Sequence, residues 1–156
     1  MASKKDVDLV NLSQTKWADI VLRIGKAYRE KSNLDILVSE LLHNVYAFDH
    51  CDVLFKPTLA KNEQFRSSKD EFISYFIGEN NVCKEDKGFA IKKWKSIKFQ
   101  GYKISSYGDS IISMGNYFFE DQEGSSLKVE YTFGFIKINN ENELKINLHH
   151  SSLPYK

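Results

Sequence analysis

Four side chains that can exchange protons or bind small oxyanions close an apolar segment near the end of the chain. Residues 144–148 read Leu-Lys-Ile-Asn-Leu, which is typical of a strand, and His149, His150, Ser151 and Ser152 follow directly. An imidazole titrates near neutral pH, and a hydroxyl both donates and accepts hydrogen bonds. Because neighbouring strand residues point to opposite faces, His149 and Ser151 share one face, and His150 and Ser152 share the other. We interpret the segment as one wall of a polar pocket; the alternative is that these side chains bond to buried backbone groups or form a dimer contact.

The sequence does not predict a metal or cofactor site. The histidines are His43, His50, His149 and His150, and none of their spacings is that of H-x-x-x-H or H-E-x-x-H zinc sites. His50, Cys51 and Asp52 are contiguous, but a strand would direct them apart. The sequence contains neither a glycine-rich phosphate loop nor a Gly-x-Ser-x-Gly or Cys/His pattern for a nucleophile. We therefore expect no metal and no cofactor.

Composition indicates one globular domain. The chain has 156 residues, of which 42% are hydrophobic, and a formal net charge of +1, so charge favours neither nucleic acid nor an anionic membrane as a partner. Two cysteines do not form a disulfide framework, and the N-terminus lacks the apolar run of a signal peptide. No segment approaches the length of a membrane span. We expect a reduced, cytoplasmic protein.

The elements that must position the pocket begin with helices. Residues 1–14 are polar and predict a loose lead-in, after which Ser13 or Thr15 caps a helix that places Trp17, Ile20, Val21, Ile24 and Tyr28 on one face. Asn33 caps a second helix with an apolar stripe from Leu34 to Val45. Ser68 and Glu71 form a capping box that opens a third, shorter helix.

Strands dominate the remainder. A short strand is predicted at 51–55, and longer ones at 89–99, 101–107, 110–120, 126–138 and 143–152, separated by turn signals such as Gln100-Gly101 and the segment 139–142. Alternating apolar residues indicate a half-buried antiparallel sheet. Helices followed by a meander predict an α+β fold with the helices on one face, in a single domain over residues 15–156.

Several short motifs occur in an order that resembles a known group of proteins. They are Tyr46-Ala47, Val53-Leu54, Pro57-Thr58, Arg66, Tyr75-Phe76, Gly115-Asn116-Tyr117-Phe118, Tyr131-Thr132-Phe133 and the ending His149–Pro154. The order and spacing are similar to those of stand-alone proteins of the calcium/calmodulin-dependent protein kinase II association domain family, with its cone-shaped nuclear transport factor 2-like (SnoaL-like) fold. Within that group the ending and the Tyr-Thr-Phe strand most resemble the iota-class carbonic anhydrases.

This resemblance implies a fold, a site and an activity. The fold is a curved antiparallel sheet wrapped around a long N-terminal helix, commonly paired as a homo-oligomer, most simply a homodimer. The site is a polar pocket formed by Thr58, Tyr75, His149 and Ser151. The activity is metal-free, reversible hydration of CO2 to bicarbonate, in which His149 accepts or shuttles a proton at an unperturbed pKa near 6.5. The bland alternatives are a local turn bond for Thr58 and a core aromatic role for Tyr75.

Two further residues are predicted to bind the substrate. Arg66 precedes the third helix and could reach an anion, although a surface salt bridge is an alternative. Tyr131 alternates with Val129 and Phe133, which are apolar and should face inward.

The chain departs from the family pattern at three positions. Glu130 stands where such proteins carry Arg, Leu144 where Trp is usual, and Tyr155 where an acid is common. A carboxylate beside the pocket would weaken the binding of bicarbonate. Two other functions therefore stay open: a non-catalytic self-association module, or a binder of a small organic ligand in a pocket lined by the abundant Phe and Tyr.

Overall fold

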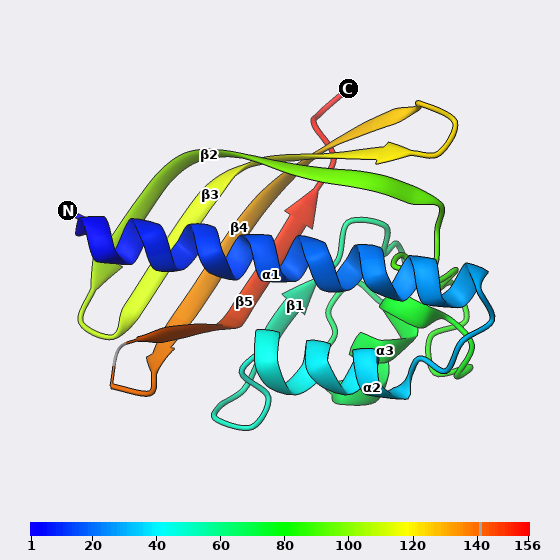
Figure 1. Cartoon of the computed structure of the whole chain (residues 1–156), viewed down its shortest axis with the longest axis horizontal. Coiled ribbons are helices and arrows are strands. Elements are labelled where there is room, and N and C mark those ends of the chain that lie inside the picture. The colour runs from blue at the N-terminus through cyan, green and yellow to red at the C-terminus, as the bar shows by residue number, and fades with distance from the viewer. Residues whose placement is uncertain (141) are drawn as a thin grey trace.

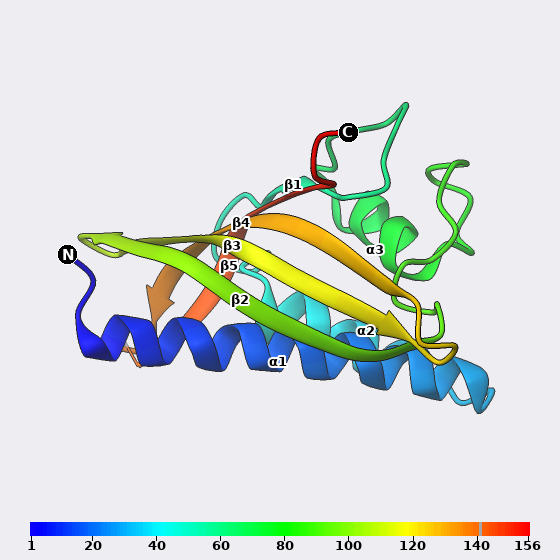
Figure 2. The same ribbon diagram turned by 90° about the horizontal axis from the view of Figure 1, so that it is seen from above.

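The structure, a computed structural model, describes residues 1–140 and 142–156. Helix α1 (Lys4–Arg29) runs across one face of a curved sheet, and α2 (Asp35–Glu40), the π-helical turn η1 (Leu41–Val45) and α3 (Lys69–Ile77) gather toward the C-terminal end of α1 (Figures 1 and 2). The sheet has the order β1-β5-β4-β3-β2 and comprises β1 (Leu54–Lys56), β2 (Trp94–Tyr107), β3 (Ser110–Asp121), β4 (Ser126–Ile138) and β5 (Glu143–Ser152). Among the described strands, β1 and β5 pair in parallel and the other neighbours pair antiparallel. The predicted α+β fold is confirmed.

Helix α1 begins earlier than the sequence suggested, so the prediction of a loose lead-in over residues 1–14 was wrong. A capping box of Ser3 and Asp6 opens the helix at Lys4. Asp6 is buried, and its carboxylate lies 3.1 Å from Lys137 on β4, which lowers its pKa to about 2. The polarity of this segment suggested that it stays outside the fold, but a buried charge such as that of Asp6 is tolerated when it has a partner.

The core forms between α1 and the sheet. Trp17 lies at its centre, with edge contacts to Phe76, Phe119 and Phe133. The apolar stripe of α1 (Val10, Trp17, Ile20, Val21 and Ile24) is buried throughout. Each of these side chains contributes about 1.5–3 kcal/mol by leaving water, so the central helix and the sheet hold each other in place.

The strand predictions hold in outline and fail at two ends. Gln100-Gly101 is not a turn: β2 continues through it with a bulge between Gly101 and Lys103. The backbone approaches closely there, since a Cβ on Gly115 would lie 2.5 Å from the carbonyl oxygen of Gln100. Strand β1 begins at Leu54 rather than at Cys51, and β2 begins at Trp94 rather than at Phe89. The predicted turn at 139–142 includes residue 141, which lies outside the described residues.

The capping prediction for α3 is confirmed, whereas that for α2 differs by one residue, because Leu34 is the N-cap of α2 and Asn33 precedes it. Ser68 accepts a hydrogen bond from the Glu71 N–H at 3.2 Å at the start of α3, and the Asn33 side chain accepts one from the Asp35 N–H at 2.7 Å before α2. Within the described residues, none of the helices combines the length and the apolar character needed to cross a membrane.

Candidate active site

A small cavity lies where β5, the end of β1 and α3 meet the centre of α1. Its space for the centre of a water molecule is about 10 Å³, about the least that holds one water. Its lining residues are Trp17, Phe55, Pro57, Thr58, Tyr75, Phe76, Phe89, Tyr117, His149 and Ser151. We call this space the inner cavity. It combines an aromatic shell with a few hydroxyl groups, which suits a small molecule with polar oxygen atoms.

Strand geometry brings His149 and Ser151 to the inner cavity. Both are buried, with 2% and 1% of their surface exposed, whereas His150 is exposed. Their register partners on β4 are Phe133 and Tyr131, which lie on the same inward face. The Phe133 ring stacks on the imidazole of His149 at 4.2 Å. The alternation predicted from the sequence is therefore confirmed for this strand.

A chain of hydrogen bonds runs from α1 through His149 to the hydroxyls at the inner cavity. Trp17 Nε1–H donates to the Tyr46 phenol oxygen at 2.9 Å, and that oxygen lies 2.7 Å from His149 Nδ1. Because Tyr46 accepts from Trp17, its own proton goes to Nδ1, and the imidazole therefore carries its hydrogen on Nε2. The turn η1 ends at Tyr46 and sets this residue in place through the bond of the Tyr46 N–H to the Leu41 carbonyl, at 3.1 Å.

His149 Nε2, Tyr117 and Ser151 form a triangle of short contacts. Nε2 lies 3.0 Å from Ser151 Oγ and 3.1 Å from the Tyr117 phenol oxygen, and these two oxygens are 2.5 Å apart. Only one of the two hydroxyl protons can occupy the bond between the oxygens. The other is free to donate to a molecule in the inner cavity, so the triangle presents a hydrogen-bond donor there.

Burial keeps the titratable groups of the inner cavity neutral. Burial, followed by the repulsion of His150, lowers the pKa of His149 to about 3. Burial also raises the pKa of both Tyr75 and Tyr117. A hydrogen bond with the Thr58 hydroxyl lowers both pKa values, but its effect is smaller than that of burial. The expectation of an unperturbed His149 pKa near 6.5 was therefore wrong, because that expectation did not include desolvation.

The structure brings Thr58, Tyr75, His149 and Ser151 together, but it does not bring Arg66 or Tyr131 to them. The Arg66 side chain is fully buried and binds Asp86 through two nitrogens, at 2.6 and 2.9 Å. Its other bonds go to the carbonyl groups of Glu63 and Glu71. It is neither a cavity residue nor the surface salt bridge considered from the sequence.

Tyr131 faces inward, as predicted, yet it does not line the inner cavity, and its phenol oxygen lies near Gly115 on β3 and Gly101 on β2. A Cβ on Gly115 would lie 2.8 Å from this oxygen. Among the described residues the buried Tyr131 hydroxyl has no hydrogen-bond partner. The structure therefore does not support a substrate contact from this side chain.

Glu130 lies on the opposite face of the sheet from the inner cavity. It pairs in register with Ser152, is exposed, and accepts a hydrogen bond from the Ser152 hydroxyl at 2.9 Å. The expectation that its charge lies beside the pocket was wrong. The presence of Glu instead of Arg at this position therefore places no carboxylate beside the inner cavity.

Sequence reasoning missed three residues of the site: Trp17, Tyr46 and Tyr117. Each was assigned to a motif or to the apolar core. The side chain of each has a single polar atom, and that atom forms a hydrogen bond of the chain. A usable signal was present for Tyr117, because it alternates with Phe119 on the same strand face as the core.

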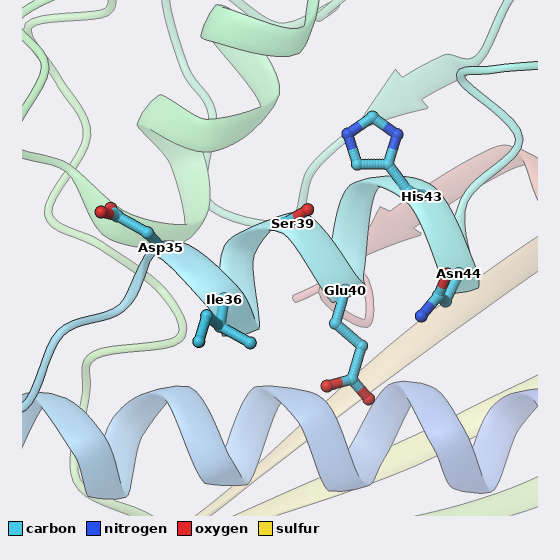
Figure 3. Close-up of a pocket in the computed structure, with 6 residues that line it drawn as sticks. All are labelled: Asp35, Ile36, Ser39, Glu40, His43 and Asn44. Atoms are coloured by element: carbon cyan, nitrogen blue, oxygen red, sulfur yellow. The ribbon is translucent and has the colours of Figure 1, made fainter.

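The surface also carries hollows that are wider than the inner cavity and that are lined by polar side chains. One of about 430 Å³ lies along α2 and η1, lined by Asp35, Ile36, Ser39, Glu40, His43 and Asn44 (Figure 3). Glu40 points toward α1, where Arg23 binds it at 2.6 Å, and His43 bonds to Asp49. Within the described part of the chain, no group of three or more His, Cys, Asp or Glu side chains is placed to hold a metal ion.

Two solved structures of the wider fold resemble the chain at low identity. A protein from Xanthomonas campestris named for the calcium/calmodulin dependent protein kinase II association domain is 24% identical, with a TM-score of 0.54 over 72% of this chain and 71% of that one. A protein of the nuclear transport factor 2-like family from Streptomyces avermitilis is 16% identical, with a TM-score of 0.56 over 97% of each chain. These likenesses confirm the predicted nuclear transport factor 2-like fold.

Nearer relatives are carbonic anhydrases. The crystal structure of an iota-carbonic anhydrase from a cyanobacterium, complexed with bicarbonate, is 30% identical, with a TM-score of 0.89 over 99% of this chain and 94% of that one. The metal-independent carbonic anhydrase of Nostoc sp. (strain PCC 7120) is 32% identical over 147 residues, which are 92% of this chain and 71% of that protein. The family model of metal-independent carbonic anhydrase matches residues 8–153. The chain therefore belongs to the metal-independent carbonic anhydrase family, as its motifs suggested.

Proposed function

We propose that this chain catalyses the reversible hydration of CO2 in the inner cavity. Water adds to the carbon of CO2, one O–H bond of the water breaks, and bicarbonate and a proton leave. The observation that carries this proposal is the hydrogen-bond chain from Trp17 through Tyr46 and His149 to Ser151 and Tyr117, which ends in a donor at a water-sized space.

The hydroxyl groups would act on the charge that develops during the reaction. As the new C–O bond forms, negative charge moves onto the CO2 oxygens, and fixed hydrogen-bond donors stabilise it most strongly in a site with little water. Three donors are available: the triangle of His149, Tyr117 and Ser151, the Thr58 hydroxyl and the Tyr75 phenol. Tyr75 accepts a long bond from the Leu59 N–H, 3.4 Å, and this bond does not use the proton of its own phenol.

His149 would act as a neutral donor and not as the proton acceptor. Its Nδ1 is occupied by Tyr46, its Nε2 carries the hydrogen, and its pKa is lowered to about 3 by burial. The imidazole instead polarises Ser151 and Tyr117. The released proton would pass by exchange between hydroxyls to Thr58, the one hydroxyl residue of the inner cavity that is only half-buried, and then to solvent.

The small size of the inner cavity favours a substrate of a few heavy atoms over a larger organic ligand. About 10 Å³ admits one water molecule, so even a small substrate requires a side chain of the wall to move, and a larger ligand would require more of the core to rearrange. The self-association alternative is compatible with catalysis, and we propose a homodimer formed through the outer face of the sheet. That face exposes Tyr102, Ile112 and Met114, at 84%, 46% and 52% of their surface, and apolar groups gathered on one face are typical of an interface.

Stopped-flow CO2 hydration with chelator-treated protein tests the proposed function. Ser151→Ala removes a hydroxyl of the triangle, and Ser152→Ala removes its neighbour on the opposite face of β5. We expect activity that survives chelation, falls about 100-fold in Ser151→Ala and is unchanged in Ser152→Ala. Wild-type protein no faster than the uncatalysed reaction would refute the proposal.

A further inference from the structure

A second cavity adjoins the inner cavity on the side of α3. It has a volume of about 50 Å³, and we call it the vestibule. Its lining residues are Leu59, Tyr75, Glu85, Asp86, Lys87, Gly88, Phe89 and Lys92. Tyr75 and Phe89 also line the inner cavity, so these two rings form the wall between the two spaces.

The wall is held mainly by ring packing. Tyr75 stacks on Phe89 with 5.5 Å between the centroids and 14° between the planes. The Tyr75 phenol accepts a bond from the Leu59 N–H at 3.4 Å, which is long for a hydrogen bond, and it also interacts with the Thr58 hydroxyl. The inner cavity has room for about one water, whereas bicarbonate has four heavy atoms. An anion therefore needs the space that displacement of Tyr75 toward the vestibule would open.

The carboxylates of the vestibule are already engaged. Asp86 receives both nitrogens of the Arg66 fork and the Ser74 hydroxyl, at 2.6 Å. Glu85 accepts the backbone N–H groups of Lys61 and Glu63, at 2.8 and 2.7 Å, and that of Asn62. Their negative charge is thus largely compensated before any ligand arrives.

Lys92 is the cation of the vestibule that faces the wall. Its Nζ lies 5.8 Å from the centroid of Phe89, and the side chain is half-buried. Among residues 1–140 and 142–156 it forms no ion pair with a carboxylate, and burial lowers its pKa. A partly desolvated ammonium without a counter-ion gains from an anion placed beside it.

We propose that the vestibule is a binding site for a small oxyanion, bicarbonate, in which Lys92 holds the anion against the face of the Tyr75–Phe89 wall. This inference rests on the proposed function, for which the vestibule would serve as the route of bicarbonate to and from the inner cavity. Lys92 is then a positioning and affinity residue, and Tyr75 is both a donor to the substrate and the movable part of the wall.

Binding is tested separately from catalysis. Backbone amide signals of ¹⁵N-labelled protein are followed by NMR while bicarbonate replaces chloride at constant ionic strength and pH. We compare the wild type with Lys92→Met, which keeps the apolar stem, Lys92→Arg, which keeps the charge, and Lys93→Met, which removes the neighbouring lysine that does not line the vestibule. The same four proteins are assayed for bicarbonate dehydration, with KM and kcat reported separately.

We expect saturable shifts of the Gly88 and Phe89 amides in the wild type, Lys92→Arg and Lys93→Met, with an apparent Kd about 5-fold weaker or more in Lys92→Met. The KM for bicarbonate should rise by a similar factor. Absence of saturable shifts in the wild type, or equal Kd values for the wild type and Lys92→Met, would overturn the inference. Saturable shifts without any dehydration would instead refute the proposed function and leave the anion site standing.

Discussion

The Nδ1 atom of His149 lies 2.7 Å from the phenol oxygen of Tyr46, and this contact sets the direction of every hydrogen bond beyond it. Because Trp17 donates to the same phenol oxygen, at 2.9 Å, Tyr46 has to donate to the imidazole. The hydrogen of His149 is thereby directed to Ser151 and Tyr117. A residue of the central helix thus determines which proton faces the candidate active site, although Trp17 itself supplies no reacting group.

Tyr46→Phe should release the tautomer of His149 and slow catalysis. The variant leaves His149 Nδ1 and Trp17 Nε1–H without their partner, so we expect the free energy of unfolding to fall by about 2 kcal/mol and kcat/KM to fall about 100-fold. Urea unfolding and stopped-flow hydration measure the two effects, and ¹⁵N NMR of the imidazole reports the tautomer.

Tyr131→Phe is the matched control for this variant. It also removes a buried phenol hydroxyl, but one that has no hydrogen-bond partner among the described residues. We expect unchanged activity and a free energy of unfolding that is equal or slightly higher, because an unsatisfied polar group leaves the core. Equal losses in Tyr46→Phe and Tyr131→Phe would show that the hydrogen-bond chain has no special role.

The buried imidazole should make the fold sensitive to acid. The pKa of His149 is lowered from 6.5 to about 3 in the folded chain, so between these values the unfolded chain binds a proton that the folded chain does not. The contribution of His149 to the free energy of unfolding therefore decreases as the pH is lowered, by up to about 1.4 kcal/mol per pH unit between pH 6 and pH 4.

Urea unfolding at pH 7, 6, 5 and 4 for the wild type and His149→Gln measures this slope. The variant lacks the titrating group, so its free energy of unfolding should fall less steeply over the same range, whatever its value at pH 7. Parallel curves for the two proteins would mean that His149 titrates normally. In that case its role as proton acceptor would be open again.

Residue patterns predicted much of this site, and they failed where the partner of a side chain is distant in sequence. The alternation of β5 placed His149 and Ser151 on one face, and the resemblance directed that face to the cavity and added Thr58 and Tyr75. The partners Tyr46 and Tyr117 lie 103 and 32 residues from His149. No local spacing could pair them, because the pairing depends on how η1 and β3 meet β5.

The two errors at charged residues have different physical origins. Arg66 was expected to bind a ligand because the sequence does not reveal its partner. That partner, Asp86, lies 20 residues away, across a loop. Glu130 could have been placed correctly, since the alternation that turns Val129 and Tyr131 inward turns Glu130 outward. Because the family pattern has Arg at this position, the negative charge of Glu130 was expected to weaken the binding of bicarbonate. The two-residue period of the strand instead directs this charge to the outer face of the sheet.

Removal of Arg66 should unfold the chain rather than weaken substrate binding. Arg66→Met leaves the buried Asp86 without its counter-ion, which we expect to lower the free energy of unfolding by about 3–5 kcal/mol. Arg23→Met is the control: Arg23 also binds carboxylates, Asp19 and Glu40, but it is half-exposed, and its loss should cost about 1 kcal/mol or less. A raised KM with unchanged urea unfolding in Arg66→Met would restore the substrate-binding role.

Neutralising Glu130 should leave catalysis unchanged. Its carboxylate is exposed and bonded to Ser152 on the outer face of the sheet, so Glu130→Gln should keep the KM for bicarbonate within about 2-fold and the free energy of unfolding within about 0.5 kcal/mol. Bicarbonate dehydration with the wild type and the variant tests this. A markedly lower KM in Glu130→Gln would show that the charge acts on the anion across the sheet.

The outer face of the sheet should carry the dimer contact. Met114→Glu places a charge among Tyr102 and Ile112, and a buried unpaired carboxylate strongly opposes association. Leu12→Glu adds the same charge to α1 at a side chain of equal exposure, 51% against 52% for Met114. By sedimentation velocity we expect the wild type and Leu12→Glu to be dimers and Met114→Glu a monomer. A dimer that persists in Met114→Glu would move the interface away from this face, and a monomeric wild type would exclude the homodimer.

Because the inner cavity lies on the other side of the sheet, a folded Met114→Glu monomer should retain CO2 hydration, which separates assembly from catalysis.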